Sequence, residues 1–263
     1  MLDINTLFQD LALYDIFEGM TSISAVIKSV SVGSSNRQII AILFDGSRAD
    51  HKSRELSFLR KKAESLHFEL IEIDSEFISS ITSGETHGGI IAITTKRTFT
   101  DNIVNNLTFG TFFALIEGIE DPYNFGYSIR SLYASGVDGI ILPPRNWMEY
   151  SGTVARSSAG TSELADIFIC DPVDAVTTFK KHGFKIVCAS IRDSVPIYDY
   201  DFTQPILLVV GGEKRGISRK ILDLSDANVR IDYGREFMGS LPSASAVSVI
   251  SFEVARQKAI LKK

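Results

Sequence analysis

The segment ILLVVGGEKRGIS, residues 206–218, decides the fold class of this chain. It opens with an unbroken apolar run from Ile206 to Val210, which is typical of a strand buried on both faces of a sheet. A glycine-rich loop follows directly. In open α/β sheets, ligands bind in the loops beyond the carboxyl ends of the strands, so we expect the chemistry of this chain in loops of this kind.

Similar short apolar runs recur through the second part of the chain and alternate with helical patterns. This alternation predicts an α/β fold with a mostly parallel sheet that helices cover on both faces. The expected strands are 112–116, 139–142, 166–169, 185–189, 206–210 and 229–232, and the expected terminal helix is 247–260.

A polar stretch, KRTFTDN at residues 96–102, lies between two apolar runs and marks the best domain boundary. The sequence therefore predicts a smaller α/β domain at residues 1–97, a linker at 98–108 and a larger domain at 109–263. In the smaller domain we expect strands at 39–44, 70–73 and 89–94 and a helix at 51–66.

The composition is that of an ordinary globular protein without bulk positive charge. The 263 residues are 44% hydrophobic, and 27 Lys and Arg stand against 32 Asp and Glu, for a net charge of −5. These values exclude a disordered chain and a domain that binds nucleic acid through its overall charge. Any RNA contact has to come from local clusters, whose plainer interpretation is a solvated face: Arg60-Lys61-Lys62, Lys214-Arg215 and Arg219-Lys220.

Several features favour a reduced cytoplasmic protein. No apolar run reaches the ~18 residues that a membrane helix needs, and the N-terminus is acidic where a secretory signal would be basic. The two cysteines, Cys170 and Cys188, cannot form a disulfide scaffold or a zinc site alone. The four histidines show no metal-ligand spacing, so we expect neither a membrane segment nor a metal.

The first loop of chemical interest is EGIEDPYNFG, residues 117–126, which leads into a helix ending near Gly136. Asn124 stands near the helix start, where its side chain can cap backbone N–H groups. Gly126 and Arg130 are four residues apart and lie on one face of the helix. The glycine, which has no side chain, therefore leaves space in front of the guanidinium of Arg130. An ordinary capped helix with an exposed arginine is the alternative. The expected buried stripe is Phe125, Ile129, Leu132 and Tyr133.

The second loop, residues 211–218, resembles two nucleotide-binding motifs and satisfies neither. Its glycines do not fall as G-x-G-x-x-G, and Ile217 occupies the position of the phosphate-binding lysine of a P-loop. Glu213 would place a carboxylate inside the phosphate cradle. The loop therefore favours a nucleoside ligand without phosphates, and a phosphate-binding α/β enzyme is a weaker alternative.

The third segment, IDYGREFMGSLPSASA at residues 231–246, precedes the terminal helix. Pro242 suits the first helical turn, where its missing N–H costs nothing. The small residues that follow allow another backbone or a ligand to approach closely. A small-residue helix packed in a core explains them equally well.

Taken together, these loops resemble the SpoU (TrmH-like) family of S-adenosylmethionine-dependent RNA 2′-O-ribose methyltransferases, which belong to the SPOUT class. The order and spacing of the matches run from Leu115 to Gln257. The matching residues are DPYNFG at 121–126 with Arg130 and Gly136, RSSAG at 156–160, Gly211 with Glu213 and Gly216-Ile217-Ser218, and MGSL at 238–241. More loosely, THGGIIA at 86–92 resembles the end of the small RNA-binding domain of many members.

The resemblance implies a SPOUT domain with a deep trefoil knot, a smaller N-terminal RNA-binding domain, and a homodimer whose neighbouring protomer helps to build the site. It implies S-adenosylmethionine as cofactor and RNA as substrate, with ribosomal RNA favoured over transfer RNA. By position, the catalytic residues are Asn124, Arg130, Glu213 and Ser240. The residues that line the cofactor are Gly211, Gly212, Glu213, Gly216, Ile231, Met238, Gly239, Ser240 and Leu241.

The resemblance also raises a point of chemistry. The family is described as using the motif arginine as the base, but arginine stays protonated up to a pH of ~12. We expect Arg130 to stabilise the developing alkoxide, while an RNA phosphate or Glu213 accepts the proton. The chain departs from the family at Pro242, which replaces the usual asparagine, and at Lys214, which replaces a common glycine. Because of these changes, the alternative function is that of a catalytically weak or inactive protein that binds RNA or the ribosome.

Overall fold

The structure is a computed structural model, which describes residues 10–82, 87–101, 103–107, 111–144, 150–212 and 214–260. The chain forms two compact units. The first unit comprises Met1–Thr98 and Asn146–Leu164, and the second comprises Phe99–Arg145 and Ala165–Lys263.

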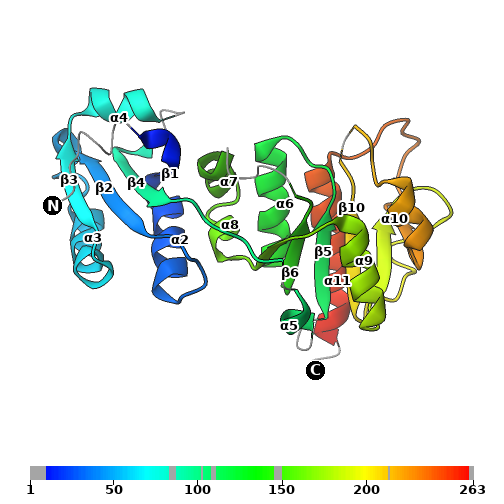
Figure 1. Cartoon of the computed structure of the whole chain (residues 1–263). Coiled ribbons are helices and arrows are strands. Elements are labelled where there is room, and N and C mark those ends of the chain that lie inside the picture. Colours follow the sequence, from blue (N-terminus) through cyan, green and yellow to red (C-terminus); the bar gives the residue numbers. More distant parts are fainter. Residues whose placement is uncertain are drawn as a thin grey trace. The chain divides into compact units, whose positions relative to one another are not determined.

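The first unit is built on a four-stranded sheet with strand order β1-β4-β2-β3. β4 is antiparallel to both β1 and β2, whereas β2 and β3 are parallel. The strands are β1 (Tyr14–Glu18), β2 (Ile39–Asp45), β3 (Glu69–Ile73) and β4 (Ile90–Thr95). The helices that follow β1, β2 and β3 are α2 (Gly19–Ser31), α3 (Ser53–Leu66) and α4 (Ser75–Ile81), visible in Figure 1.

Two short helices from the middle of the chain, α7 (Ser151–Ser157) and α8 (Thr161–Leu164), belong to the first unit. Ala155 of α7 is fully buried in the same core cluster as Phe17. A Cβ at position 152 would overlap the carbonyl oxygen of Ile16, so Gly152 lets α7 lie directly against β1. The boundaries expected from the sequence assign these residues to the larger domain, because nothing in their pattern reveals a contact with residues so far away.

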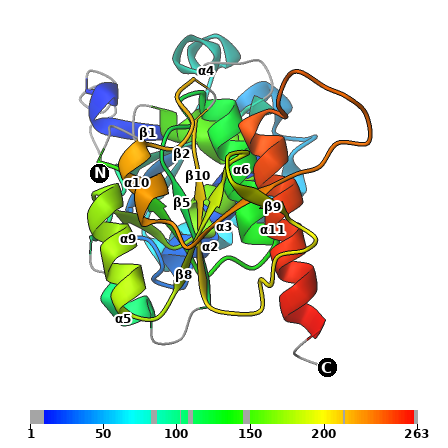
Figure 2. The same ribbon diagram turned by 90° about the vertical axis from the view of Figure 1, so that its right-hand side faces the viewer.

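The second unit contains a seven-stranded sheet with strand order β7-β6-β5-β10-β8-β11-β9. Every described pairing in it is parallel. The strands are β5 (Phe112–Ile116), β6 (Gly139–Leu142), β7 (Ile167–Ile169), β8 (Lys185–Ala189), β9 (Ser194–Pro196), β10 (Ile206–Val210) and β11 (Ala227–Arg230). The helices are α5 (Val104–Leu107), α6 (Pro122–Ala134), α9 (Pro172–Lys181), α10 (Arg219–Leu224) and α11 (Ser243–Ile260), and Figure 2 shows α6 and α11 side by side.

The core of the second unit explains why the apolar runs predict its strands so well. β5 and β10 are buried along their full length at the centre of the sheet. Phe113, Phe179 and Phe184 pack edge to face with ring centroids 5.0–5.6 Å apart. Aromatic pairs prefer this geometry, and it joins the central strand to the helix α9 that covers it.

Four expected strands, 112–116, 139–142, 185–189 and 206–210, are confirmed with unchanged bounds. The expected strand 229–232 begins two residues earlier, at Ala227, and the terminal helix begins at Ser243 instead of 247. The carbonyl of Pro242 accepts hydrogen bonds from the N–H groups of Ser245 and Ala246, so the proline does start the helix. The expected fold, α/β with a mostly parallel sheet, is confirmed, and the trefoil knot remains a prediction from the resemblance.

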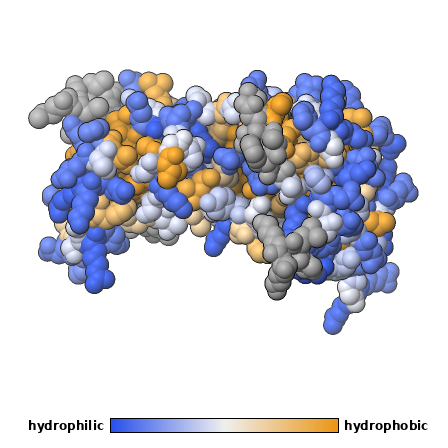
Figure 3. Space-filling view, turned by 90° about the horizontal axis from the view of Figure 1, so that it is seen from below, coloured by the Kyte–Doolittle hydropathy of each residue, from blue (hydrophilic) through white to orange (hydrophobic). Residues whose placement is uncertain are grey.

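Within the described residues, no helix is long and apolar enough to cross a membrane. Figure 3 shows hydrophilic residues over much of the visible surface, with apolar residues in small groups between them.

Candidate active site

The loop after β5 leads into α6 through a cap that differs from the one expected. Asp121 is the N-cap, and its carboxylate accepts a hydrogen bond from the backbone N–H of Asn124 at 2.8 Å. The expectation that the Asn124 side chain caps this helix is therefore wrong. Asn124 lies in the first helical turn, with Pro122 at the first helical position. An aspartate before proline is a strong start signal for a helix.

Arg130 lies on the exposed face of α6, four residues after the buried Gly126. In the described part of the chain, its guanidinium has no hydrogen-bond or ion-pair partner. Tyr123 and Tyr127, on the same face of the helix, are 46% and 47% exposed. The expected buried stripe is confirmed except for Tyr133, which is 38% exposed. Among the described residues, α6 thus presents an unpartnered cation beside two phenol rings.

The glycine loop after β10 is packed against the loop after β5. A Cβ at Gly212 would overlap the carbonyl oxygen of Gly118, so the two backbones touch where no side chain could fit. The N–H of Gly216 donates to the carbonyl of Gly212 at 3.0 Å and closes a tight turn. Gly211 and Gly212 are half-buried. Glu213, a predicted catalytic and cofactor-binding residue, lies outside the described residues.

Glu117, which no motif in the sequence marks as a site residue, joins the same two loops. Its carboxylate accepts a hydrogen bond from the N–H of Ser218 at 2.8 Å, and its own N–H donates to the carbonyl of Val210 at 2.9 Å. Lys214 and Glu120 add an exposed ion pair at 3.2 Å, which contributes little. The only sequence signal for Glu117 is its place directly after a buried strand.

The third predicted segment is an exposed loop between β11 and α11, coloured orange in Figure 2. Met238 is 96% exposed, Gly239 and Ser240 are exposed, and Ile231 and Leu241 are half-buried. The loop is ordered by its own aromatic residues. Tyr233 and Phe237 pack edge to face at 5.5 Å, and the Tyr233 hydroxyl accepts a hydrogen bond from the N–H of Leu241 at 3.2 Å.

The backbone of this loop is available for a ligand. Among the described residues, none of the N–H and C=O groups from Ile231 to Ser240 is hydrogen-bonded to another backbone group. Backbone polar groups are normally paired, with protein, water or ligand. The described segment therefore offers main-chain donors and acceptors to a ligand, and its side chains include both apolar and charged groups.

The helices link the first and third motifs. The hydroxyls of Ser131 on α6 and Ser248 on α11 lie 2.7 Å apart, in a hydrogen bond between the helix that carries Arg130 and the helix that follows the exposed loop. The structure thus brings the first motif beside the second through Glu117 and Gly118, and beside the third through α6 and α11. Ser240 has no described contact with Arg130.

The cysteines are not poised for chemistry. Burial, reinforced by the Glu117 carboxylate, raises the pKa of the Cys188 thiol to about 12. Burial and the nearby Asp174 and Asp171 also raise the pKa of Cys170. Because the thiolate is the reactive form, neither cysteine is an activated nucleophile at neutral pH. No group of three or more metal-ligating side chains occurs within the described ranges.

The family model described as "SpoU rRNA Methylase family" matches residues 111–252. The chain belongs to this family. The match begins just before β5, includes every predicted catalytic and cofactor-binding residue, and ends within α11. It does not include the first part of the chain.

Two curated relatives match different lengths of this chain. A "Putative TrmH family tRNA/rRNA methyltransferase" of Staphylococcus haemolyticus is 30% identical over 145 residues, which are 55% of this chain and 58% of that protein. The chain thus covers less than two thirds of that relative. A "23S rRNA (guanosine-2'-O-)-methyltransferase RlmB" of Ralstonia nicotianae is 25% identical over 229 residues, 86% of this chain and 90% of that protein.

A solved structure resembles the whole chain in fold. The SpoU methyltransferase AviRb from Streptomyces viridochromogenes, in complex with the cofactor AdoMet, aligns with a TM-score of 0.76 at 23% identity. The alignment covers 98% of this chain and 94% of that chain. The architecture of both units is therefore one that an experimentally determined protein adopts.

Proposed function

We propose that this protein is a methyltransferase that transfers a methyl group from S-adenosylmethionine to a ribose 2′-hydroxyl of RNA. The observation that carries this proposal is the loop that follows β11, whose main-chain groups from Ile231 to Ser240 have no backbone hydrogen-bond partner among the described residues. Membership of the SpoU family supports it. A glycine turn without the lysine of a P-loop suits a nucleoside sulfonium better than a triphosphate.

The residues present fit this cofactor. Main-chain groups would hold the nucleoside and amino-acid parts, because the described loop offers both N–H donors and carbonyl acceptors. The proposed lining residues are Gly211, Gly212, Glu213, Gly216, Ile231, Met238, Gly239, Ser240 and Leu241. When bound, the cofactor supplies an electrophilic methyl group.

The chain's own contribution is alignment and electrostatics. We assign Arg130 to stabilise negative charge as the ribose hydroxyl loses its proton, because a guanidinium stays charged and offers directed donors. Glu213 or an RNA phosphate accepts the proton. Asn124, in the first turn of α6, and Ser240, next to Leu241, are assigned to orient the hydroxyl.

A second protomer and ribosomal RNA complete the proposal. Arg130 has no partner among the described residues of one protomer, which supports a site that a neighbouring protomer finishes in a homodimer. Ribosomal RNA is favoured because a relative that matches along most of this chain is named for 23S rRNA. The hydroxyl to be methylated has to be splayed into the site, so single-stranded or loop RNA is the expected substrate.

The proposal is tested by titrating the protein with S-adenosylmethionine in a calorimeter and then measuring transfer of labelled methyl groups to bulk ribosomal and transfer RNA. Binding of the cofactor and methylation of ribose in ribosomal RNA are expected. Cofactor binding without methyl incorporation into either RNA would contradict the enzyme assignment.

That outcome would favour the second candidate, an RNA- or ribosome-binding protein with the same fold and little or no activity. Pro242 is the observation behind it. The family's usual asparagine at this position has a side-chain amide, whereas Pro242 offers only its carbonyl, which is engaged at the start of α11.

A further inference from the structure

The loop after β5 holds the glycine turn, residues 211–218, at both of its ends. At the start of the turn, the backbone of Gly118 lies so close to Gly212 that no side chain fits between them. At the end of the turn, the carboxylate of Glu117 accepts a hydrogen bond from the N–H of Ser218 at 2.8 Å. Two consecutive residues of one loop therefore fix the two ends of the other.

The sheet itself fixes the position of Glu117. Its N–H donates to the carbonyl of Val210 at 2.9 Å, which extends the parallel ladder of β5 and β10 by one step beyond the pair Ile116 and Val210. The backbone of Glu117 is thus held as in a strand, and its side chain retains only rotamer freedom. The carboxylate reaches Ser218 from a rigid support.

Ser218 joins the glycine turn to α10. Its carbonyl accepts hydrogen bonds from the N–H groups of Ile221 and Leu222, both at 3.1 Å, so it begins the helix. Ile217, the residue before it, is buried in the core of the second unit. The first N–H groups of a helix have no acceptor within the helix, and Glu117 supplies one from outside.

The hydrogen bond of Glu117 is charge-assisted and is not shared with a cation. Among the described residues, the carboxylate forms no ion pair, and the N–H of Ser218 is its hydrogen-bond donor. Hydrogen bonds to an ionised group are about twice as strong as neutral ones. Loss of the carboxylate would therefore release the end of the turn, and no other described contact of this side chain would replace the bond.

The strand order puts these two loops where an open α/β sheet binds its ligand. From β5 the chain continues to β6 and β7 on one side of the sheet, whereas β8 lies on the other side, beyond β10. The order of the strands reverses at this point, and ligands of such sheets bind there, beyond the carboxyl ends of the strands. Glu117 and Gly118 follow β5, and the glycine turn follows β10.

We infer that Glu117 is a positioning residue of the cofactor site, which through Ser218 holds the glycine turn in the conformation that receives S-adenosylmethionine. The inference rests on the proposed function, which assigns Gly211, Gly212 and Gly216 to the cofactor. A loop that is ordered before its ligand arrives loses less conformational freedom on binding, so the affinity is higher. Glu117 acts through the turn and does not itself touch the cofactor.

Glu117→Ala is compared with Asp138→Ala, which removes hydrogen bonds of the same kind from the opposite end of β5. The Asp138 carboxylate accepts hydrogen bonds from the N–H groups of Thr111 and Phe112, at 2.7 and 2.9 Å. Both variants should lower the melting temperature. In calorimetric titrations, only Glu117→Ala should raise the Kd for S-adenosylmethionine, by about tenfold, as for one lost charge-assisted hydrogen bond.

Glu117→Gln separates the hydrogen bond from the charge. The amide oxygen of glutamine still accepts a hydrogen bond from Ser218, so the Kd should stay within about threefold of the wild-type value. In methyl-transfer assays, Glu117→Ala should raise the KM for S-adenosylmethionine while kcat stays within about twofold of the wild-type value, because a group that acts only on binding leaves the chemical step unchanged.

Hydrogen exchange measures the turn itself, in protein without cofactor. The N–H of Gly216 donates to the carbonyl of Gly212 at 3.0 Å and is protected while the turn is closed. This amide should exchange about tenfold faster in Glu117→Ala than in the wild-type protein, as for the loss of one hydrogen bond. Its exchange in Asp138→Ala and Glu117→Gln should be close to that of the wild type.

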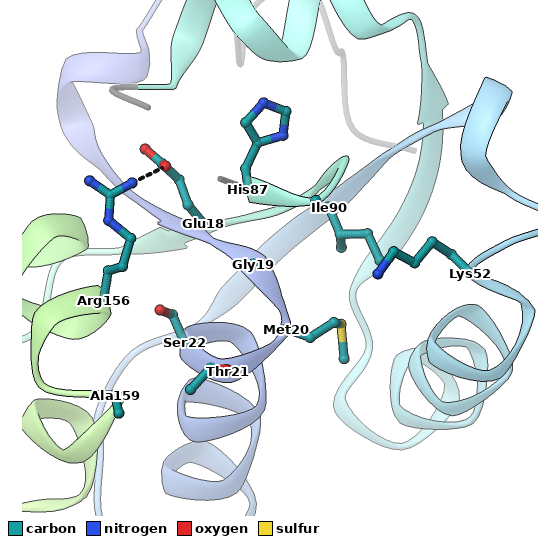
Figure 4. Close-up of a pocket in the computed structure, with 11 residues that line it drawn as sticks. Glu18, Gly19, Met20, Thr21, Ser22, Lys52, His87, Ile90, Arg156 and Ala159 are labelled. Carbon is teal, nitrogen blue, oxygen red and sulfur yellow. Dashed lines mark hydrogen bonds and ion pairs between the residues drawn. The ribbon is translucent and has the colours of Figure 1, made fainter. Parts of the chain in front are cut away.

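A cavity in the first unit offers a second place for a small molecule. It has a volume of about 410 Å³ and is lined by the end of β1, the start of α2 and part of α7, among other segments, as Figure 4 shows. The exposed Thr21 lies in its wall, so Thr21→Trp narrows it. This variant should bind S-adenosylmethionine like the wild-type protein. A raised Kd in Thr21→Trp with an unchanged Kd in Glu117→Ala would locate the cofactor in this cavity and overturn the inference.

Two further results contradict the positioning role. Equal Kd values for Glu117→Ala and Asp138→Ala would show that the turn does not depend on this carboxylate. Binding by Glu117→Gln as weak as that of Glu117→Ala would show that the charge acts on the cofactor directly. Failure of the proposed function has a different signature. A wild-type protein that binds no S-adenosylmethionine removes both, whereas binding that depends on Glu117, without methyl transfer, retains this inference and removes the enzyme.

Discussion

Arg37 and Glu163, separated by 126 positions in the sequence, share a buried hydrogen-bonded ion pair with 2.8 Å between Nε and Oε2. The guanidinium also pairs with Asp15 and lies over the ring of Phe17, 4.9 Å from its centroid. Burial opposes the charge, yet the carboxylate of Glu163, followed by that of Asp15, raises the pKa of Arg37 above its ordinary value. The pair fastens α8 to the sheet of the first unit.

Removal of this cation should destabilise the first unit strongly. Arg37→Ala leaves Glu163 and Asp15 buried without a partner, so we expect the free energy of unfolding to fall by about 3–5 kcal/mol. Urea unfolding measures the change. Arg219→Ala, which breaks an exposed pair with Asp223, should cost less than about 0.5 kcal/mol. Equal losses in the two variants would show that the buried pair contributes no more than a surface pair.

Gly212→Ala should disrupt the glycine turn. The added methyl would overlap the carbonyl of Gly118, so one of the two loops has to move, at a cost of about 1–3 kcal/mol. We expect calorimetry to show a Kd for S-adenosylmethionine at least about tenfold higher, since each 1.4 kcal/mol is tenfold. The control is Gly183→Ala, outside the proposed site, where an added Cβ meets nothing within 4 Å and only the positive φ of 83° strains the new residue; its Kd should stay as in the wild-type protein. An unchanged Kd in Gly212→Ala would place the cofactor elsewhere.

Arg130→Lys should separate catalysis from folding. Because the side chain is exposed and has no partner in the described residues, the melting temperature should not change. Loss of the directed guanidinium should lower kcat for methyl transfer by about a hundredfold, the usual effect of removing one donor that stabilises developing charge. The Kd for S-adenosylmethionine, measured alongside, should stay the same. Near-normal turnover would show that any cation suffices at this position.

Cys188 should make stability fall in alkaline solution. Its pKa is about 12 in the folded protein, against 9.0 for a free thiol, so the unfolded chain loses this proton first as the pH rises. The stabilising effect is complete below pH ~9 and is lost between pH ~9 and ~12, at up to about 1.4 kcal/mol per pH unit. Urea unfolding at pH 8 and pH 10 should show a smaller decrease for Cys188→Ala than for the wild-type protein.

The sequence predicts the second unit well because its strands are buried on both faces. β5, β6 and β10 read as unbroken apolar runs, β8 does so after Lys185, and the expected ends of all four coincide with the observed ones. No pattern in the sequence predicts β1, because YDIFE neither alternates regularly nor forms an apolar run: its two carboxylates, Asp15 and Glu18, are both buried. The strand β11 is displaced by two residues because ANVR contains a single strongly buried side chain, Val229.

The candidate site could be predicted only in part. The glycines of the second loop and Arg130 could be predicted from the sequence, because these residue types are unusual at their positions. The sequence does not separate Asp121 from Asn124 as the cap of α6, since both residue types can cap a helix and the two stand close together. Glu117 makes its contact across 101 positions, and no local pattern encodes such a bond. The same holds for α7 and α8, whose partners in β1 and α2 lie more than a hundred residues away.

The attachment of α7 and α8 to the first sheet has a practical consequence for dissection of the protein. A recombinant fragment cut at the polar stretch near residue 98 would lack Ala155 and Glu163. It would expose the patch of core that Ala155 covers, and among the described carboxylates it would leave Arg37 paired with Asp15 alone. Such a fragment should precipitate or bind chaperones. A chimaera that carries residues 10–98 joined by a linker to residues 150–164 is the smallest piece worth expressing.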